Sequence, residues 1–589
     1  MSQAMRIGGR AAKWMTSVNF RRPRTPMLDV PSMFAEPIMA DHFSLPPHRP
    51  LHARQREHLV QRGSRAIDRA LQRPCAYRHP AGRIRRIETH ISVVYLAGRY
   101  AYKLKKPVNP GFVDFTRPAV RRRACEDEVR LNRRLARELY CGVETIVRKG
   151  RVYRFDRQGR VVEHAVRMRR FEEREVFGAL LARGALGFAE IDALAERLAG
   201  FHRCAARAAP GGNFGSASAV RGQMRTVLDS FERATGTPVP GTLRRWCDAE
   251  GTRLAGHFEA RRAGGFVREC HGDLHLANVV RRGKRVLMFD CIEFSDTLRW
   301  IDVASDLSFL LMNLQAHDRD DLAARLLNGW LQRTGDFAAL PAVRYYMVYR
   351  ALVRALVVAL KARSCPTGDG IEQTNRYLQL AERMIAKPRP YLLLCHGYSG
   401  SGKSVASEAL VSLIGAIRVS SDIERNRPCP FAPADTRPLP RATYSTHAID
   451  RHYGTLLALT RQALSAGYPV LVDATFLKRE HRSSFAALGN ALSVPVIVLD
   501  FHARTCLLAE RVGKRAAQAH AESDAGPAVL VRQLANEEPL SVEEMGDTVY
   551  FDTEVPLGAF AHIGYWQALL ERLDALERQN RAMPEVAHA

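Results

Sequence analysis

A glycine-rich octapeptide in the C-terminal third of the chain constrains the fold more than any other feature. Gly397–Ser404 reads GYSGSGKS and matches the spacing G-x-x-x-x-G-K-[ST]. The apolar run Tyr391–His396 precedes it, and a helical pattern follows it. A strand, a tight glycine turn and a helix N-terminus in this order direct backbone N–H groups at an anion. The octapeptide therefore predicts a phosphate-binding loop, whose members are Gly397, Tyr398, Ser399, Gly400, Ser401, Gly402, Lys403 and Ser404.

Two side chains of this loop suit the chemistry of a nucleoside triphosphate. Lys403 is placed to reach the β- and γ-phosphates, and the Ser404 hydroxyl suits a Mg²⁺ ligand. Lysine is scarce in this chain, with 11 among 88 basic residues, so a lysine at this position is more informative than usual. We therefore expect ATP as the ligand, bound together with Mg²⁺.

Strand-like and helical segments alternate through the rest of this region. Helical patterns separate most of the further predicted strands, which are Ala416–Ser420, Pro469–Val472, Val494–Phe501 and Thr548–Phe551. Alternation of this kind predicts an α/β domain with a mainly parallel sheet and crossover helices.

Two carboxylates follow predicted strands, at the sheet edge where open parallel sheets bind their ligands. Asp473 is the candidate Mg²⁺ ligand, and Asp422 is the candidate base for an attacking hydroxyl. The alternative for either is a polar strand end without a functional role. Arg511 and Arg515 lie four residues apart on one predicted helix face, which suits a phosphate-binding lid or a solvated basic face.

Together these segments resemble a predicted kinase family among the P-loop, or AAA, proteins. The resemblance covers about residues 391–560 and rests on Gly397–Ser404, Ser421–Arg425, Val472–Phe476 and Ser523–Ala525. That family groups with polynucleotide 5′-kinases and with enzymes similar to zeta-toxin and chloramphenicol phosphotransferase. The resemblance implies that Asp422 is the acceptor-side carboxylate and that Arg511 and Arg515 form the lid.

A second group of polar residues lies in the middle of the chain. His271–Asn278 reads HGDLHLAN, and an apolar strand delivers Asp290. Asp273 and Asn278 have the spacing of the catalytic H-R-D-L-x-x-x-N loop. Phosphoryl transfer needs a carboxylate to orient and deprotonate the acceptor hydroxyl, and oxygen ligands for Mg²⁺. Asp273 suits the first role, and Asn278 and Asp290 suit the second.

A lysine further upstream completes this group. The segment YAYK that ends at Lys103 has the arrangement of the V-A-I-K strand, which directs its lysine at the α- and β-phosphates. A helix predicted over Ala124–Leu139 supplies Glu126 and Glu128, either of which suits the partner of Lys103, and we take Glu128 as the candidate. A solvated lysine in a cluster of three is the alternative.

These segments resemble the aminoglycoside-phosphotransferase-like family. The resemblance rests on Thr89–Ser92, Ala101–Lys105, Leu131–Leu135, His271–Asn278, Phe289–Phe294 and Asp302–Asp306. More narrowly, the chain is similar from about Gly82 onward to bacterial bifunctional chains that join such a domain to a P-loop ATP-binding domain. The resemblance implies a bilobal, protein-kinase-like domain of the α+β class ahead of the P-loop domain.

The sequence thus divides into three parts. Residues 1–60 are rich in Arg, Pro and Met and predict a basic extension without stable structure, followed by the kinase-like domain at 61–386 and the P-loop domain at 387–589. The 11 scattered cysteines contain no CxxC pair, which favours a reducing, cytoplasmic environment. No apolar run is long enough to cross a bilayer.

The net charge of each domain limits the classes of molecule that it is expected to bind. Residues 391–589 carry 19 basic and 22 acidic side chains, which disfavours bulk electrostatic binding to nucleic acid. Residues 87–390 carry 52 basic and 34 acidic side chains, which favours neutral or anionic acceptors over polycationic ones.

The preferred hypothesis is an enzyme with two Mg·ATP sites, each passing a phosphoryl group to the hydroxyl of a small molecule. One alternative is a P-loop ATPase switch joined to a kinase-like domain that binds without turnover. A second alternative is a nucleic-acid end kinase, with the basic extension recruiting RNA.

Overall fold

The computed structural model describes residues 63–109, 111, 113–364, 370–386, 389–428, 445–516 and 526–582. They form two compact units, one made of residues 63–317 and 342–386, the other of residues 318–341 and 389–582. The predicted extension 1–60 and the segment Ser523–Ala525 lie outside the described residues. The domain boundaries predicted at 61–386 and 387–589 stay a prediction.

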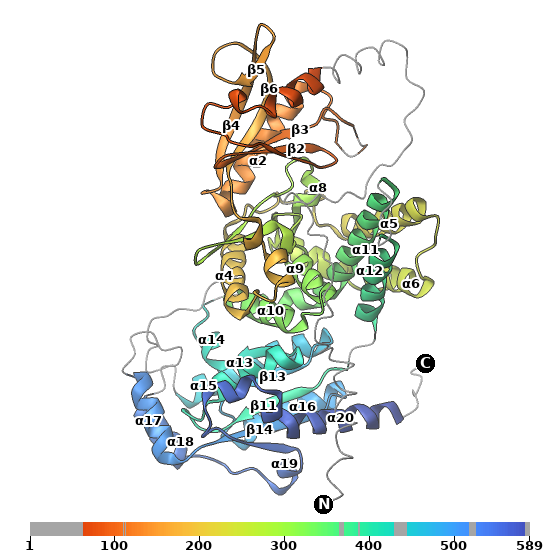
Figure 1. Cartoon of the computed structure of the whole chain (residues 1–589). Coiled ribbons are helices and arrows are strands. Elements are labelled where there is room, and N and C mark those ends of the chain that lie inside the picture. The colour runs from red at the N-terminus through yellow and green to blue at the C-terminus, as the bar shows by residue number, and fades with distance from the viewer. Residues whose placement is uncertain are drawn as a thin grey trace, which may run out of the picture. The chain divides into compact units, whose positions relative to one another are not determined.

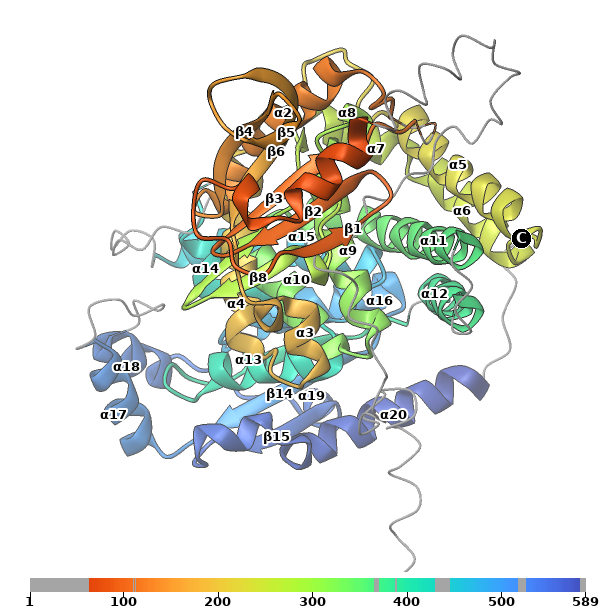
Figure 2. The ribbon, with the colours of Figure 1, turned by 45° about the horizontal axis from the view of Figure 1, so that its top comes forward.

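An antiparallel sheet begins the first unit (Figure 2). Its spatial order is β1-β2-β3-β6-β4-β5. The strands are β1 (Arg85–Glu88), β2 (Ser92–Ala97), β3 (Tyr100–Lys105), β4 (Tyr140–Lys149), β5 (Val152–Phe155) and β6 (Arg160–Arg169). Gly98 has φ +55° in the tight turn between β2 and β3, which form an antiparallel hairpin. Lys103 pairs with Val94 on one side and Val166 on the other, so β3 is a central strand.

Helix α2 (Pro118–Ala136) packs on one face of this sheet (Figure 2). It begins six residues before the predicted start at Ala124, because Pro118 occupies its first turn, where a missing N–H costs no hydrogen bond. Val129 and Ala136 of α2 join the apolar cluster under the sheet. The helix therefore carries Glu128 directly beneath the strands.

The rest of the first unit is mainly helical. Its helices are α3 (Phe177–Ala182), α4 (Phe188–Cys204), α5 (Ala217–Thr235), α6 (Gly241–Arg253), α7 (Ala255–Ala263), α8 (Asp296–Arg299), α9 (Val303–Ala316), α11 (Leu340–Ser364) and α12 (Gly370–Ile385). Two small antiparallel pairs complete it, β7 (Val267–Glu269) with β10 (Trp300–Asp302) and β8 (Val279–Arg282) with β9 (Arg285–Met288). A short helix, η4 (Leu276–Asn278), lies between β7 and β8.

The second unit contains a five-stranded sheet in which every described pairing is parallel, as predicted (Figure 1). Its spatial order is β12-β13-β11-β14-β15. The strands are β11 (Leu392–His396), β12 (Ile417–Ser420), β13 (Val470–Asp473), β14 (Val496–His502) and β15 (Thr548–Asp552). The helices that follow strands are α13 (Lys403–Ile414), α14 (Ser421–Arg425), α15 (Thr446–Ser465), α16 (Arg479–Leu492), α17 (Thr505–Ala516), α18 (Pro527–Ala535), α19 (Val542–Gly546) and α20 (Gln567–Ala582).

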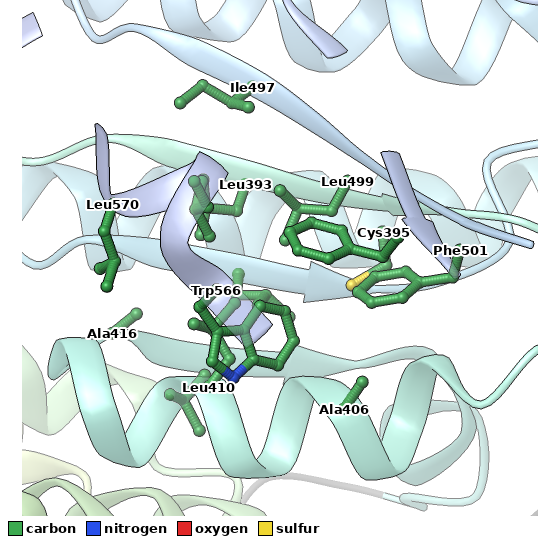
Figure 3. Close-up of a cluster of buried hydrophobic side chains, with 14 of the residues drawn as sticks. Leu393, Cys395, Ala406, Leu410, Ala416, Ile497, Leu499, Phe501, Trp566 and Leu570 are labelled. Carbon is green, nitrogen blue, oxygen red and sulfur yellow. The ribbon is translucent and has the colours of Figure 1, made fainter. Parts of the chain in front are cut away.

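Alternation along the strands places one apolar set between the sheet and α13. Leu393, Leu499 and Phe501 point from the strands toward Leu410 of α13, with the indole of Trp566 between them (Figure 3). This packing fixes α13 against β11, so the glycine loop that joins them has two rigid ends.

One segment folds away from its neighbours in sequence. Helix α10 (Asp320–Thr334) and η5 (Phe337–Ala339) lie between α9 and α11 in the chain, yet belong to the second unit. There α10 packs against α13 and β12. The sequence did not predict this arrangement.

No helix among the described residues is both long enough and apolar enough to cross a membrane.

Candidate active sites

Two lysines and three carboxylates of the first unit form one buried cluster. Lys103 contacts Glu128 at 3.0 Å and donates a hydrogen bond to Asp290. Lys105 contacts Glu128 at 2.6 Å and donates to Glu293. Alternate residues of a strand share a face, so β3 delivers both ammonium groups to the same side. Glu128 therefore bridges the two lysines.

Burial distinguishes the two glutamates that were candidate partners of Lys103. Glu128 is fully buried, and Lys103 is only 5% exposed rather than solvated. Glu126 is exposed and pairs with Arg122 at 2.9 Å on the surface of α2. The partner of Lys103 is therefore Glu128.

Opposite charges set the protonation of this cluster. Burial alone would lower the pKa of Lys103, but Asp290, Glu128 and Glu293 together raise it. Burial would raise the pKa of Glu128, but the two lysines lower it. Burial does raise the pKa of Glu293, which lies beside the negative Glu128. These shifts favour the charged forms of Lys103 and Glu128.

The loop after β7 presents a carboxylate and an amide side by side. Asn278 donates through Nδ2 to the Asp273 carbonyl at 2.9 Å, and the same nitrogen lies 3.5 Å from Asp273 Oδ2. Burial would raise the pKa of Asp273, but His275, whose Nε2 is 3.5 Å from Oδ2, lowers it. Asp273 is therefore ionised at neutral pH and suited to accept a proton or a hydrogen bond.

Two oxygen donors beside Asp273 fit a divalent cation. The Oδ1 atom of Asn278 is buried and has no hydrogen-bond partner among the described residues. The Phe289 N–H donates to the backbone carbonyl of Asn278 at 3.0 Å, which ties the backbone just before Asp290 to Asn278. The Asn278 Oδ1 atom, which receives no hydrogen bond there, and the Asp290 carboxylate are oxygen ligands of the kind that Mg²⁺ prefers.

The backbone at Asp290 is held in an unusual conformation. Asp290 has φ +67°, a region that non-glycine residues seldom adopt. Its N–H donates to the Tyr140 hydroxyl at 3.1 Å, and the Cys291 N–H donates to Asn132 Oδ1 at 2.9 Å. Side chains of β4 and α2 therefore fix the direction of the Asp290 carboxylate.

A buried carboxylate on α9 organises the catalytic-loop backbone. Asp306 accepts hydrogen bonds from the N–H groups of His271 at 3.1 Å and Gly272 at 3.0 Å. It also lies 3.2 Å from His202 Nε2. Burial opposes ionisation, but His202 and the loop N–H groups lower the pKa of Asp306 to about 2. The loop that carries Asp273 is thus anchored by a buried negative charge.

In the second unit, the glycine loop adopts the predicted conformation. Gly397, Gly400 and Gly402 have φ of +130°, +88° and +85°. A Cβ atom on Gly397 would lie 2.3 Å from the Phe501 carbonyl oxygen, so no larger residue fits there. Lys403 folds back over the loop and donates to the carbonyls of Gly397 at 2.8 Å and Tyr398 at 2.7 Å. Burial lowers the pKa of Lys403, although the Asp473 carboxylate opposes this.

Asp473 lies at the end of β13 but is engaged by an arginine. Arg418 of β12 donates to Asp473 Oδ2 at 2.5 Å and to the Ser404 carbonyl at 3.2 Å. Both Arg418 and Asp473 are buried. One guanidinium therefore joins the two residues predicted as Mg²⁺ ligands, and their carboxylate and hydroxyl oxygens are donors that fit this ion.

Asp422 lies on α14, directly after β12. Arg425, one turn later, approaches Asp422 Oδ1 at 3.5 Å and donates to the Ser421 hydroxyl at 3.0 Å. His452 Nε2 also lies 3.0 Å from that hydroxyl. Parallel register aligns Ser420 with Asp473, so Asp422 begins at the same sheet edge as the metal candidate.

The two arginines of α17 differ in their surroundings. Arg511 donates to the Gly400 carbonyl at 3.3 Å and to the Thr553 carbonyl at 2.8 Å, so it braces the glycine loop. Burial lowers the pKa of Lys403, and the positive charge of Arg515 adds to this as a minor cause. Arg511 is therefore engaged with the glycine loop, while Arg515 stays a predicted lid residue.

Helix α18 and the residues after it contact the glycine loop. The Ser399 N–H donates to Gln533 Oε1 at 2.9 Å, and the Tyr398 hydroxyl donates to Glu537. A side-chain carbonyl oxygen thus accepts from one backbone donor of the loop.

Several residues of both sites were not predicted from the sequence. They are Lys105, Glu293, Asn132, Tyr140, Arg418, Asn328 and Gln533. Lys105 lies on the same strand face as Lys103, two residues on, and the strand period could have found it. The others are joined to the sites by long-range contacts that no local spacing reveals.

Two family models match the chain. A model described as "Phosphotransferase enzyme family" matches residues 98–346, and one described as "AAA domain" matches residues 392–540. The matched ranges contain the Lys103 cluster with Asp273 and the glycine loop with Asp473, respectively.

Individual relatives and solved structures share less than a third of their aligned residues with this chain. Uncharacterised proteins of Mycobacterium tuberculosis and Mycobacterium bovis are each 29% identical over 453 residues, which is 76% of this chain and 89% of the relative. A gluconokinase from Sinorhizobium meliloti aligns to 33% of this chain and 98% of its own, at 24% identity and a TM-score of 0.24. A choline/ethanolamine kinase family protein from Mesorhizobium loti aligns to 55% and 95%, at 13% identity and a TM-score of 0.34.

Proposed function

Because this chain is an ATP-dependent enzyme that carries a phosphotransferase-family domain followed by an AAA domain, we propose that both domains turn over. Each transfers the γ-phosphoryl group of ATP to the hydroxyl of a small molecule. The observation that carries the proposal is the cluster in which Lys103, Glu128 and Asp290 meet, next to a loop that presents Asp273 and Asn278. A domain that only binds nucleotide has no need for the ionised Asp273.

In the kinase-like domain, the chain's own residues account for positioning and proton transfer. The Lys103 ammonium, held by Glu128, neutralises the α- and β-phosphates of ATP. Asp273 accepts a hydrogen bond from the acceptor hydroxyl, orients its oxygen toward the γ-phosphorus and takes its proton as the new P–O bond forms. ADP departs with the electrons of the broken bond.

In the AAA domain, backbone N–H groups of the glycine loop and the Lys403 ammonium hold the β- and γ-phosphates. Asp422 accepts the proton of the attacking hydroxyl, and Arg515 approaches the transferred group from α17. Asn278 and Asp290 in one domain, and Ser404 and Asp473 in the other, would hold Mg²⁺, which would neutralise negative charge on the phosphates.

Charge supports neutral or anionic acceptors for the kinase-like domain. Residues 87–390 carry 52 basic and 34 acidic side chains, a balance that repels polycations such as aminoglycosides. We therefore propose a small hydroxyl-bearing metabolite as the acceptor. The cytoplasmic location stays a prediction.

Labelled ATP separates this proposal from the two alternatives. Full-length protein is incubated with a metabolite extract and γ-labelled ATP, and labelled products are identified by mass spectrometry. We expect two sets of products, one lost in Asp273→Asn and the other lost in Lys403→Ala. ADP release that needs no acceptor and is abolished by Lys403→Ala alone would favour the ATPase switch. Label on oligonucleotide ends would favour the nucleic-acid kinase.

A further inference from the structure

Helix α10 forms hydrogen bonds with the outer strand of the parallel sheet through one side chain. Among the described strands, β12 is the last on its side of the sheet, so one row of its backbone groups has no strand partner there. Asn328 of α10 donates through Nδ2 to the Ala416 carbonyl at 2.9 Å and accepts through Oδ1 from the Arg418 N–H at 2.7 Å. A carboxamide offers a donor and an acceptor side by side and thus imitates a strand residue.

The residue held by this pairing belongs to the candidate metal site. Arg418 directs its side chain to Asp473 Oδ2 at 2.5 Å and to the Ser404 carbonyl at 3.2 Å. Asn328 is itself only 4% exposed, and its Nδ2 also donates to the Ala324 carbonyl at 3.0 Å, so its carboxamide is held in place. The path from Asn328 to Asp473 therefore consists of two hydrogen-bonded steps through a single residue.

Helix α10 reaches two further elements of the same site. Arg325 pairs with Glu408 of α13 at 2.7 Å. The carbonyl of Gln332 accepts from Arg427 at 2.6 Å, and Arg427 also pairs with Glu424 of α14 at 2.8 Å. Helix α13 begins at the glycine loop, and α14 carries the candidate base Asp422.

We infer that Asn328 is a positioning residue for the phosphate and metal site of the AAA domain, supplied by a helix from within the range of the phosphotransferase-family match. It fixes β12 so that Arg418 holds Asp473 in place, and α10 thereby makes this site dependent on chain outside residues 387–589. The inference rests on the proposed function, in which Asp473 is a Mg²⁺ ligand.

The test uses full-length protein carrying Asp273→Asn, so that the remaining ATP turnover belongs to the AAA domain. Asn328→Ala is compared with Gln332→Ala, a half-exposed residue of the same helix whose carbonyl, not side chain, makes the contact. We expect Asn328→Ala to raise the Mg²⁺ concentration for half-maximal turnover roughly tenfold or more, since outer-shell partners commonly affect metal affinity by that factor. The KM for ATP at saturating Mg²⁺ stays within about twofold, because the loop itself is unchanged.

A second readout needs no nucleotide or metal. Hydrogen exchange of the ligand-free protein should quicken at the Arg418 amide and in residues 470–473 in Asn328→Ala, and not in Gln332→Ala. If Asn328→Ala fails to fold, the isosteric Asn328→Asp decides, since it keeps the acceptor for Arg418 and loses the donor to Ala416. Equal Mg²⁺ midpoints in the Asn328 and Gln332 variants would overturn the inference. Absence of Mg²⁺-dependent turnover in the parent protein would instead overturn the proposed function.

Discussion

The carboxylate of Asp306 accepts a hydrogen bond from the Gly272 N–H at 3.0 Å, one residue before the candidate catalytic base. A side chain on a buried helix thus fixes the backbone of the loop on which the chemistry depends. Its charge is retained in the core because His202 and the loop amides compensate for burial. This relationship can be tested through the pH dependence of stability.

The stabilisation from Asp306 should be lost in acid. Its pKa falls from 3.8 to about 2 on folding, so the stabilisation is complete above the unfolded value and is lost as the pH falls toward 2. The shift corresponds to an order of 2 kcal/mol. We expect the urea-midpoint difference between the wild type and Asp306→Asn to be largest at pH 5 to 7 and to shrink by pH 3. A difference that does not change with pH would show that Asp306 acts only through packing.

Replacement of Asp273 should separate chemistry from binding in the kinase-like domain. Asp273→Asn keeps the size of the side chain and removes the proton acceptor, so turnover of that domain should fall by about 10²- to 10⁴-fold. ATP affinity should change little, because Lys103 and Asp290 are untouched. Rapid-quench and equilibrium-binding measurements check the two parts. Since the pKa of Asp273 lies below its usual range, protonation of this residue should not limit the rate near neutral pH.

Substitution of Lys103, which lies on β3, can be compared with substitution of Lys106, which directly follows β3. Lys103→Met removes the buried lysine of Asp290 and leaves Glu128 with Lys105 alone, and loss of a buried charge partner costs about 3–5 kcal/mol. It should also raise the KM for ATP at least about tenfold. Lys106 pairs with Glu88 at 2.7 Å on the surface, so Lys106→Met should change stability by less than about 1 kcal/mol. Thermal unfolding and steady-state kinetics measure both effects.

The two arginines of α17 should give opposite results. Arg511→Ala removes the donor to the Gly400 and Thr553 carbonyls and should destabilise the AAA domain by about 1–3 kcal/mol. Arg515→Ala should leave the melting temperature unchanged and lower kcat about tenfold or more, because in the proposed function Arg515 approaches the transferred phosphoryl group. If the two variants lost kcat equally and neither was destabilised, Arg511 would act as a phosphate-binding lid residue, as the sequence predicted.

The parts of the fold and of the sites that the sequence predicted are those specified by short local motifs. The glycine loop and the parallel strands around it follow from short patterns, because a strand, a turn and a helix N-terminus are specified by adjacent residues. The kinase-like fold was implied by the family resemblance, which the spacing of Asp273 and Asn278 and the V-A-I-K-like strand that ends at Lys103 help to carry.

Long-range partners were beyond prediction for a physical reason. Arg418 is one of 77 arginines, and its contact with Asp473 depends on the register of two strands that are 50 residues apart in the chain. Asn328 lies in an amphipathic helix with no motif, and only the tertiary fold brings it to β12. The predicted start of α2 at Ala124 was six residues late, because the apolar pattern begins there while Pro118 already forms the first turn.

The place of α10 in the chain also bears on biosynthesis. A ribosome makes residues 320–334 before any strand of the parallel sheet, so the nascent helix has to wait for β12 and α13 to emerge. During that interval its apolar face is a target for chaperones or for misdocking. Translation pauses after α11 would therefore lengthen the vulnerable period, whereas the kinase-like half, complete except for α12, could already have begun to fold.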